Sequence, residues 1–409
     1  MKVDRIIHNT LSLLAGGLLT VSLSGCLDDN SACIEDQPGY KEGNDVWLSF
    51  HVKNIGETAK TRAEEPIDPT HPNEEASIDE NFINTSDMAL MFFDDRQILW
   101  KSFLPGEYVV EEINGTNGSE YTLKFKMNKD YFSYAKGQEN VEYSLMVVAN
   151  INGLKGEASV FDENLFAYSP QRIASLYKSF AMPDQSVITW LPSKDNKDLI
   201  PMAGIVKGSF PSSVLENGNT WETAAKIGDV YMQRCLAKIR VLDAFRLKVE
   251  SNGDFITDVK LIGSNIFGAY IPASDNDWYD GTKVIETASE NINGNWFSND
   301  NEVIFTYSDS NFNSIVDDGV TYRGQFYCYI PEAIVDGANR DIKIEVKLSS
   351  GITKEFVLKN KYGEYQGLTQ IARNHIYEYI VDINQDSQLS LNYTVCPWMT
   401  YNIVIPPFQ

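Results

Sequence analysis

The segment Leu389–Phe408, with the sequence LSLNYTVCPWMTYNIVIPPF, alternates between apolar and polar residues along most of its length. Every odd position from Leu389 to Ile405 is apolar, which predicts extended chain with one buried face. At about 3.3 Å per residue it would span more than about 50 Å, roughly twice an ordinary strand. Pro397 lacks a main-chain donor, so we expect a break near it. The segment either folds back as a terminal hairpin, or its distal half belongs to the sheet of another molecule.

The composition is that of an acidic globular protein. The chain has 409 residues, a formal net charge of −23 and 43% hydrophobic residues, which predicts about two domains with proper cores. The negative charge argues against nucleic acid and anionic membrane surfaces as partners, since both are polyanions. The 21 Tyr and 20 Phe residues favour sheets over helical bundles.

Residues 1–25 are interpreted as a lipoprotein signal peptide. Lys2 and Arg5 precede the apolar run Leu11–Leu23, which is too short and interrupted for a stable spanning helix. The run ends in Leu23-Ser24-Gly25-Cys26, which resembles the bacterial lipobox, and that resemblance implies lipidation of Cys26. An ordinary secretory signal followed by a structural cysteine is the alternative. Residues 26–45 are expected to form a polar tether, and Leu27-Asp28-Asp29 resembles the acidic export tag of surface lipoproteins.

The first strand is predicted at Val46–Val52, where apolar and polar residues alternate cleanly. The following stretch, Gly56–Glu80, has no periodicity and combines eight acidic residues with three prolines. Such a composition cannot bury enough apolar surface to offset its ordering entropy, so we expect a mobile exposed loop. The first strand would then be tied to the rest of the protein mainly by pairing and packing.

Short alternating segments fill most of the remaining chain, and one helix is expected near Gln171–Met182. The further predicted strands are Met88–Phe93, Tyr121–Met127, Val141–Ala149, Ile200–Gly204, Val230–Leu242, Val259–Ile262, Phe267–Ile271, Val303–Tyr307, Gln325–Ile330, Asp341–Leu348, Ile352–Leu358 and His375–Ile383. This pattern predicts an all-β fold of two tandem Greek-key, transthyretin-like β-sandwiches with one or two short helices. We place the N-terminal sandwich at residues 46–227 and the C-terminal one at 228–409, with residues 46–62 as a removable first strand.

Catalytic, metal-binding and cofactor motifs are missing from the sequence, so no enzyme activity is expected. His51 lies on the polar face of a predicted strand and His71 in the acidic loop, while His375 begins a strand and is interpreted as a hydrogen-bonded structural residue. Cysteines 235, 328 and 396 lie in apolar strand patterns, which predicts small buried side chains. Whether these three or Cys33 form disulfides is left open.

An insertion rich in Gly, Asn and Asp, Ser274–Asn301, carries Trp278 and Trp296. If these aromatic rings are exposed, they could stack on sugars or anchor a protein partner. They could equally pin a long loop to the sandwich.

Several motifs together resemble the fimbrillin family of Bacteroidales, the type V pilus subunits. They are the lipobox cysteine, the isolated first strand and its loop, Arg234-Cys-Leu-Ala-Lys-Ile, Arg373-Asn-His-Ile-Tyr377, and the terminal Val395-Cys-Pro-Trp through Ile-Pro-Pro-Phe408. The resemblance covers nearly the whole mature chain. It implies a lipoprotein that reaches the outer-membrane surface and the fimbrium, with other subunits and a trypsin-like protease as partners.

The resemblance also assigns roles to individual residues. The protease would cut after Arg62, and loss of the first strand would open a groove for a strand donated by a neighbouring subunit. The donor would be the terminal segment, with Met399, Tyr401, Ile403, Ile405 and Phe408 as its apolar residues. If the chain is an anchor-type relative, Arg62 is an ordinary solvated charge. Stalk, tip and anchor roles stay open.

Two hypotheses from different classes follow. The first is a non-enzymatic fimbrial subunit that polymerises by strand exchange and serves adhesion. The alternative is a monomeric surface lipoprotein that binds glycans through the loop of Trp278 and Trp296.

Overall fold

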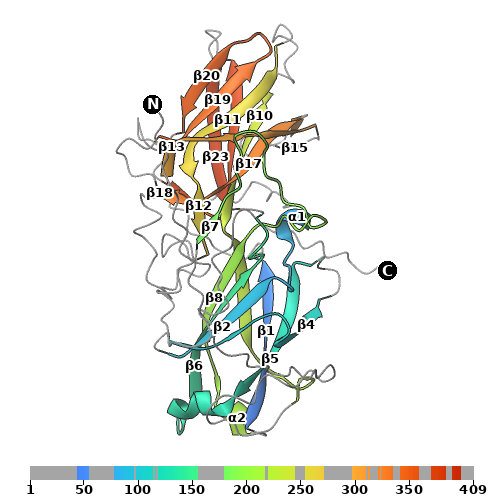
Figure 1. Cartoon of the computed structure of the whole chain (residues 1–409), viewed down its shortest axis with the longest axis vertical. Coiled ribbons are helices and arrows are strands. Elements are labelled where there is room, and N and C mark those ends of the chain that lie inside the picture. The colour runs from blue at the N-terminus through green and yellow to red at the C-terminus, as the bar shows by residue number, and fades with distance from the viewer. Residues whose placement is uncertain are drawn as a thin grey trace, which may run out of the picture. The chain divides into compact units, whose positions relative to one another are not determined.

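The protein is almost entirely β-structure (Figure 1). The computed structural model describes residues 44–54, 78–154, 179–216, 220–244, 254–270, 297–309, 312–313, 321–322, 324–334, 341–358, 370–383 and 389–397, apart from 96–97, 114–115 and 117. All described strands belong to one compact unit, Asp45–Gln409. Within the described residues, no helix is both long and apolar enough to cross a membrane.

The first half of this unit contains an eight-stranded sheet in the order β3-β2-β6-β8-β9-β1-β5-β4. Its strands are β1 (Asp45–Asn54), β2 (Met88–Phe93), β3 (Leu99–Phe103), β4 (Tyr108–Glu112), β5 (Glu120–Asn128), β6 (Asn140–Ala149), β8 (Met202–Pro211) and β9 (Ala225–Arg234). β8 and β9 share only the pairs Met202 with Arg234 and Ala203 with Gln233. The sheet therefore consists of two four-stranded halves, and buried side chains from both halves form one hydrophobic core. This is a β-sandwich.

The second half has a five-stranded sheet, β14-β17-β10-β22-β23, and a four-stranded sheet, β13-β11-β19-β20. The strands are β10 (Leu236–Asp243), β11 (Ile256–Asn265), β13 (Phe297–Ile304), β14 (Thr306–Ser308), β17 (Gln325–Pro331), β19 (Lys343–Leu348), β20 (Thr353–Val357), β22 (His375–Ile383) and β23 (Leu389–Pro397). Ile239 of β10, Leu261 of β11 and Val346 of β19 are fully buried in a core that both sheets share. The second half is therefore a sandwich as well.

Short elements complete the described structure. Three two-stranded pairs are β7 (Ser179–Ala181) with β12 (Phe267–Ala269), β15 (Phe312–Asn313) with β16 (Thr321–Tyr322), and β18 (Ala333–Ile334) with β21 (Gln370–Ile371). The helices are α1 (Ile78–Asn81), α2 (Ser213–Glu216) and the 3-10 helix η1 (Lys129–Ala135). The predicted all-β sandwich class, with one or two short helices, is confirmed.

A third buried cluster lies on the opposite face of β2 and β6 from the first core. Met91 of β2 and Met146 of β6 pack there in one cluster with Leu236 of β10 and Tyr329 of β17. Because β2 is buried on both faces, all six of its residues are buried, as its uniformly apolar sequence predicts.

Two predicted elements are wrong in detail. The pattern of Val230–Leu242 suggested one strand, but the structure interrupts it at Cys235 and places β9 and β10 in different sheets. The Cys235 amide donates to the carbonyl of Pro201, and this bond stabilises the interruption. The helix expected near Gln171–Met182 falls mostly outside the described residues, and its end at Ser179–Ala181 is strand β7.

Candidate functional site

The candidate site is the first strand, β1, and the slot it occupies between β9 and β5. β1 runs antiparallel to β5, with Asp45 opposite Asn128 and Lys53 opposite Glu120. On its other side it runs parallel to β9, with Leu48 opposite Ala225 and Asn54 opposite Met232. A strand with two neighbours stabilises two rows of main-chain groups, so its loss would expose an unpaired edge on each neighbour.

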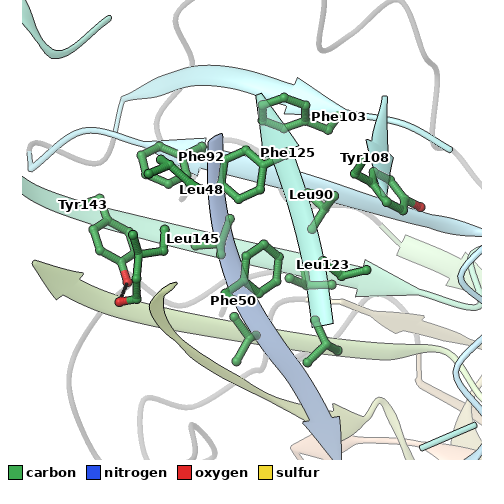
Figure 2. Close-up of a cluster of buried hydrophobic side chains, with 14 of the residues drawn as sticks. Leu48, Phe50, Leu90, Phe92, Phe103, Tyr108, Leu123, Phe125, Tyr143 and Leu145 are labelled. Atoms are coloured by element: carbon green, nitrogen blue, oxygen red, sulfur yellow. Dashed lines mark hydrogen bonds between the residues drawn. The ribbon is translucent and has the colours of Figure 1, made fainter. Parts of the chain in front are cut away.

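The inward face of β1 is apolar and fully enclosed. Val46, Leu48, Phe50 and Val52 are each 0% exposed. Figure 2 shows Leu48 and Phe50 among side chains from the neighbouring strands, with Phe50 and Phe125 of β5 in edge-to-face contact at 5.7 Å between ring centroids. Each such side chain contributes about 1.5–3 kcal/mol by leaving water. Together the four therefore contribute on the order of 6–12 kcal/mol to holding β1 in place.

The outward face of β1 carries Trp47 and Ser49 as well as charged residues. His51 and Lys53 both approach Asp229 of β9, with nitrogen–oxygen distances of 3.6 Å each. Lys226 approaches the same carboxylate at 2.9 Å. At the other end of the strand, Asp45 pairs with Lys126 of β5 at 3.4 Å.

The described residues on either side of the acidic stretch predicted after β1 contact each other. The side-chain amide of Asn54, the last residue of β1, donates to the carbonyl of Asn81 at 2.6 Å. Asn81 closes helix α1, where the described chain resumes. A break in the intervening chain would therefore leave both β1 and α1 attached by their own contacts.

The predicted resident half of the terminal segment is confirmed. β23 pairs antiparallel with β22 over its whole length, from Leu389 opposite Ile383 to Pro397 opposite His375. β23 is the last strand of the five-stranded sheet, so its outer edge has no strand partner among the described residues. Pro397 is the last described residue of β23, so the break predicted near it stays a prediction.

The site residues that the sequence predicted lie outside the described residues. They are the lipidation residue Cys26, the cleavage residue Arg62, the aromatic residues Trp278 and Trp296, and the donor residues Met399, Tyr401, Ile403, Ile405 and Phe408. Their roles stay predictions. What the structure describes is the slot that the donor would fill and the strand that precedes the donor.

Two sequence motifs that carried the family resemblance meet in the fold. The Arg234 guanidinium donates to the side-chain oxygen of Asn374 at 2.9 Å, and the Asn374 amide donates to the Leu236 carbonyl at 2.8 Å. Asn374 has a φ of +56°, in the left-handed region that Asn tolerates better than most residues. The motifs therefore hold the β9–β10 turn against the start of β22.

The same junction ties helix α1 to the second sandwich, and sequence reasoning missed this role. Arg234 Nε donates to the Glu80 carbonyl at 2.9 Å, and Arg234 Nη2 donates to the side-chain oxygen of Asn81. The Glu80 carboxylate accepts from Lys238 of β10 at 3.0 Å and from the Tyr329 hydroxyl. Burial lowers the pKa of the Arg234 guanidinium to about 10. This value is still well above 7, so the group is protonated at neutral pH. A buried acid at the end of an acidic stretch gives no signal in the sequence.

The described histidines and cysteines show no catalytic or metal-binding arrangement. His375 is buried, its Nδ1 lies 2.7 Å from the Arg373 carbonyl, and burial lowers its pKa, as expected for a structural residue. Cys235 and Cys328 are buried, as predicted, and both are free thiols; burial raises the pKa of the Cys235 thiol to about 12. No group of His, Cys, Asp and Glu suited to a metal ion occurs within the described part of the chain.

Comparison with known proteins gave structural similarities only. No protein-family model matches the chain, and no curated protein matches it. The tip fimbrial protein Mfa3 of Porphyromonas gingivalis, solved with a C-terminal truncation, is 14% identical, with a TM-score of 0.47 over 87% of this chain and 100% of the other. A fimbrial assembly protein from Parabacteroides distasonis is 14% identical, with a TM-score of 0.41 over 86% and 99%. The fimbrial anchor protein Mfa2 of P. gingivalis is 10% identical, with a TM-score of 0.35 over 87% and 99%. Over most of its length, the chain is thus similar in structure to fimbrial proteins of Bacteroidales, at low sequence identity.

Proposed function

We propose that this chain is a non-enzymatic, structural and adhesive subunit of a cell-surface fimbria, exported as a lipoprotein through Cys26. It polymerises when a trypsin-like protease cuts after Arg62 and a strand from a neighbouring subunit replaces β1. The observation that carries the proposal is β1 itself. It is an interior strand of its sheet, with four fully buried side chains, yet it precedes an acidic, proline-containing stretch that has no periodicity.

The energetics of β1 explain why a donor strand is needed in addition to the cut. Breaking the chain at Arg62 leaves the pairing with β5 and β9 and the buried apolar side chains unchanged. The strand leaves only if another supplies equivalent main-chain hydrogen bonds and apolar side chains. The terminal segment offers apolar residues at alternate positions (Met399, Tyr401, Ile403 and Ile405), which matches the four buried positions of β1.

The decisive experiment compares the chain with and without its terminal segment. The mature chain, cut after Arg62, should form fibres visible by electron microscopy. Deletion of Thr400–Gln409 should leave a folded monomer with unchanged circular dichroism that forms none. Normal fibres from the truncated chain would contradict the proposal.

A matched variant tests the cleavage step. With Arg62→Gln the chain should remain uncut and monomeric, whereas Lys60→Gln, two residues away, should be cut and assemble normally. Mass spectrometry of assembled surface material should show a mature N-terminus at Ala63. Assembled material that begins only at lipidated Cys26 would contradict the proposed cleavage. A monomer whose tryptophan fluorescence is quenched by saccharides would instead support the glycan-binding alternative.

A further inference from the structure

We call the residues of β5 and β9 that flank the outward face of β1 the rim of the slot, and the buried apolar positions beneath β1 its floor. The rim carries charges of opposite sign at its two ends. This feature matters only if β1 can be replaced, so the inference rests on the proposed function. Near the end of β1, Asp229 lies opposite His51 in the β9 register, and Glu120 lies opposite Lys53 in the β5 register. Near the start of β1, the rim presents Lys126, which pairs with Asp45. The slot is therefore acidic at one end and basic at the other.

β1 complements both ends of this rim. Its ammonium group at Lys53 lies 3.6 Å from the Asp229 carboxylate and 4.6 Å from the centroid of the Tyr231 ring. Partial burial lowers the pKa of Lys53, but Tyr231 and Asp229 raise it by more. The pKa of Lys53 therefore lies above its ordinary value. Partial burial and Lys226 lower the pKa of His51, so Lys53 is the main cation that β1 itself contributes at neutral pH. When β1 leaves, Asp229 keeps Lys226 but loses Lys53, and Lys126 loses Asp45.

The terminal segment of the chain cannot restore these pairs. From Leu389 to Gln409 the sequence contains no Asp, Glu, Lys, Arg or His. In the register in which its four alternate apolar residues replace those of β1, Val404 takes the place of His51 and Pro406 that of Lys53. A copy of this chain would therefore fill the apolar floor of the slot and leave its charged rim unmatched.

We propose that the β1 slot selects, over the terminal segment of this chain, a donor strand from a different subunit that carries an acidic residue and a basic residue at the positions of Asp45 and Lys53. Four alternate apolar residues lie between the two charges, and the strand runs in the direction of β1. Charge complementarity of this kind favours one partner and one orientation while adding little to affinity. Assembly at this slot is then heteromeric.

Synthetic strands test the proposal directly on the mature chain cut after Arg62. The native peptide, residues 45–54, is compared with a peptide carrying Asp45→Asn and Lys53→Gln, and with one in which the two charges are exchanged. Because exposed pairs are individually weak, we expect the neutral peptide to bind about fivefold more weakly at low salt, and the exchanged peptide more weakly still. High salt should reduce these differences.

Two further variants separate the rim from the floor of the slot. In the protein, Asp229→Asn should weaken the preference for the base at position 53, where Glu120 remains, and keep the preference for the acid at position 45. In a peptide of residues 399–408, Val404→Lys should tighten binding, because it places an ammonium group opposite Asp229. Gain of binding cannot arise from misfolding of the protein.

The outcomes distinguish this inference from the proposed function. Equal binding of the native, neutral and exchanged peptides would overturn the charge selection and leave strand exchange intact. Failure of every peptide to bind would contradict both. Graded binding that follows the charges and weakens with salt would support both.

Discussion

At the scale of single residues, the most constrained positions are buried polar side chains at the junction of the sandwiches. Asn374 is 1% exposed, has a positive φ and accepts a hydrogen bond from the Arg234 guanidinium. Both the backbone conformation and the side-chain oxygen of Asn374 therefore constrain which residue this position accepts. The Arg-Asn dipeptide in the sequence marks this position but does not say which partner it meets.

Substitutions of Asn374 should separate these two contributions. Asn374→Gly keeps the left-handed backbone and removes the acceptor of one Arg234 N–H group, which should cost about 1–3 kcal/mol. Asn374→Ala should cost about 1 kcal/mol more, because alanine is strained at positive φ. Urea unfolding measures both values. Equal stability of the two variants would show that the backbone conformation is not a constraint here.

His375 should make the protein sensitive to mild acid. Burial lowers its pKa in the folded state, so below the unfolded-state pKa of about 6.5 the unfolded chain binds the proton more readily. Stability should therefore fall as the pH drops from about 7 towards 5. His375→Gln, which still offers a donor to the Arg373 carbonyl, should flatten this part of the profile. The check is chemical denaturation across that range, and an unchanged slope would contradict the prediction.

At the scale of elements, β1 is held in its slot by packing and pairing. From Val46 to Val52 its inward face consists of buried apolar side chains, and its outward face carries half-buried Trp47, His51 and Lys53 and buried Ser49. The alternating sequence of Val46–Val52 predicted this division. Only the pairing showed that β1 lies between two strands, one of which follows it by more than 170 residues.

Phe50→Ala should loosen β1 in the chain cut after Arg62. Loss of a fully buried phenylalanine typically costs about 3–5 kcal/mol, so the cut strand should be released at least about 100-fold faster. Ser49→Ala, which removes only the hydroxyl that donates to the Ala224 carbonyl at 3.4 Å, should release the strand at a rate much closer to the native one. Gel filtration with mass spectrometry follows the released peptide. Similar rates for the two variants would show that core burial does not retain β1.

At the scale of the whole molecule, the two sandwiches share buried ionic contacts as well as a hydrophobic cluster. Glu80 of α1 lies beside Lys238 of β10 and Tyr329 of β17, and all three are buried. Because α1 also contacts the end of β1 through Asn81, the junction and the β1 slot share one short helix.

Breaking this ion pair from one side should be more costly than removing it entirely. Glu80→Leu should destabilise the protein by about 3–5 kcal/mol, because it removes the carboxylate that compensates the buried Lys238 ammonium. The double variant Glu80→Leu with Lys238→Met should recover most of that loss. Thermal and urea unfolding of the native protein, the two single variants and the double variant measure the free energies of this double-mutant cycle. A double variant as unstable as the sum of the single ones would mean that the two residues act independently.

The sequence by itself determined the all-β class and many of the strands, among them Val46–Val52, Met88–Phe93 and Leu389–Val395, but it missed β3 and β4. It could do so because a period of two, proline and glycine act locally along the chain. The tertiary structure alone decided which strands neighbour β1, where Val230–Leu242 is interrupted, and that Glu80, Arg234 and Asn374 meet. These features depend on contacts between residues distant in sequence, and alternation is the same whichever strands lie on either side. The terminal segment predicted either a terminal hairpin or a strand in the sheet of another molecule, whereas the fold shows β1 as an interior strand with four buried apolar side chains and with charged residues on its outward face.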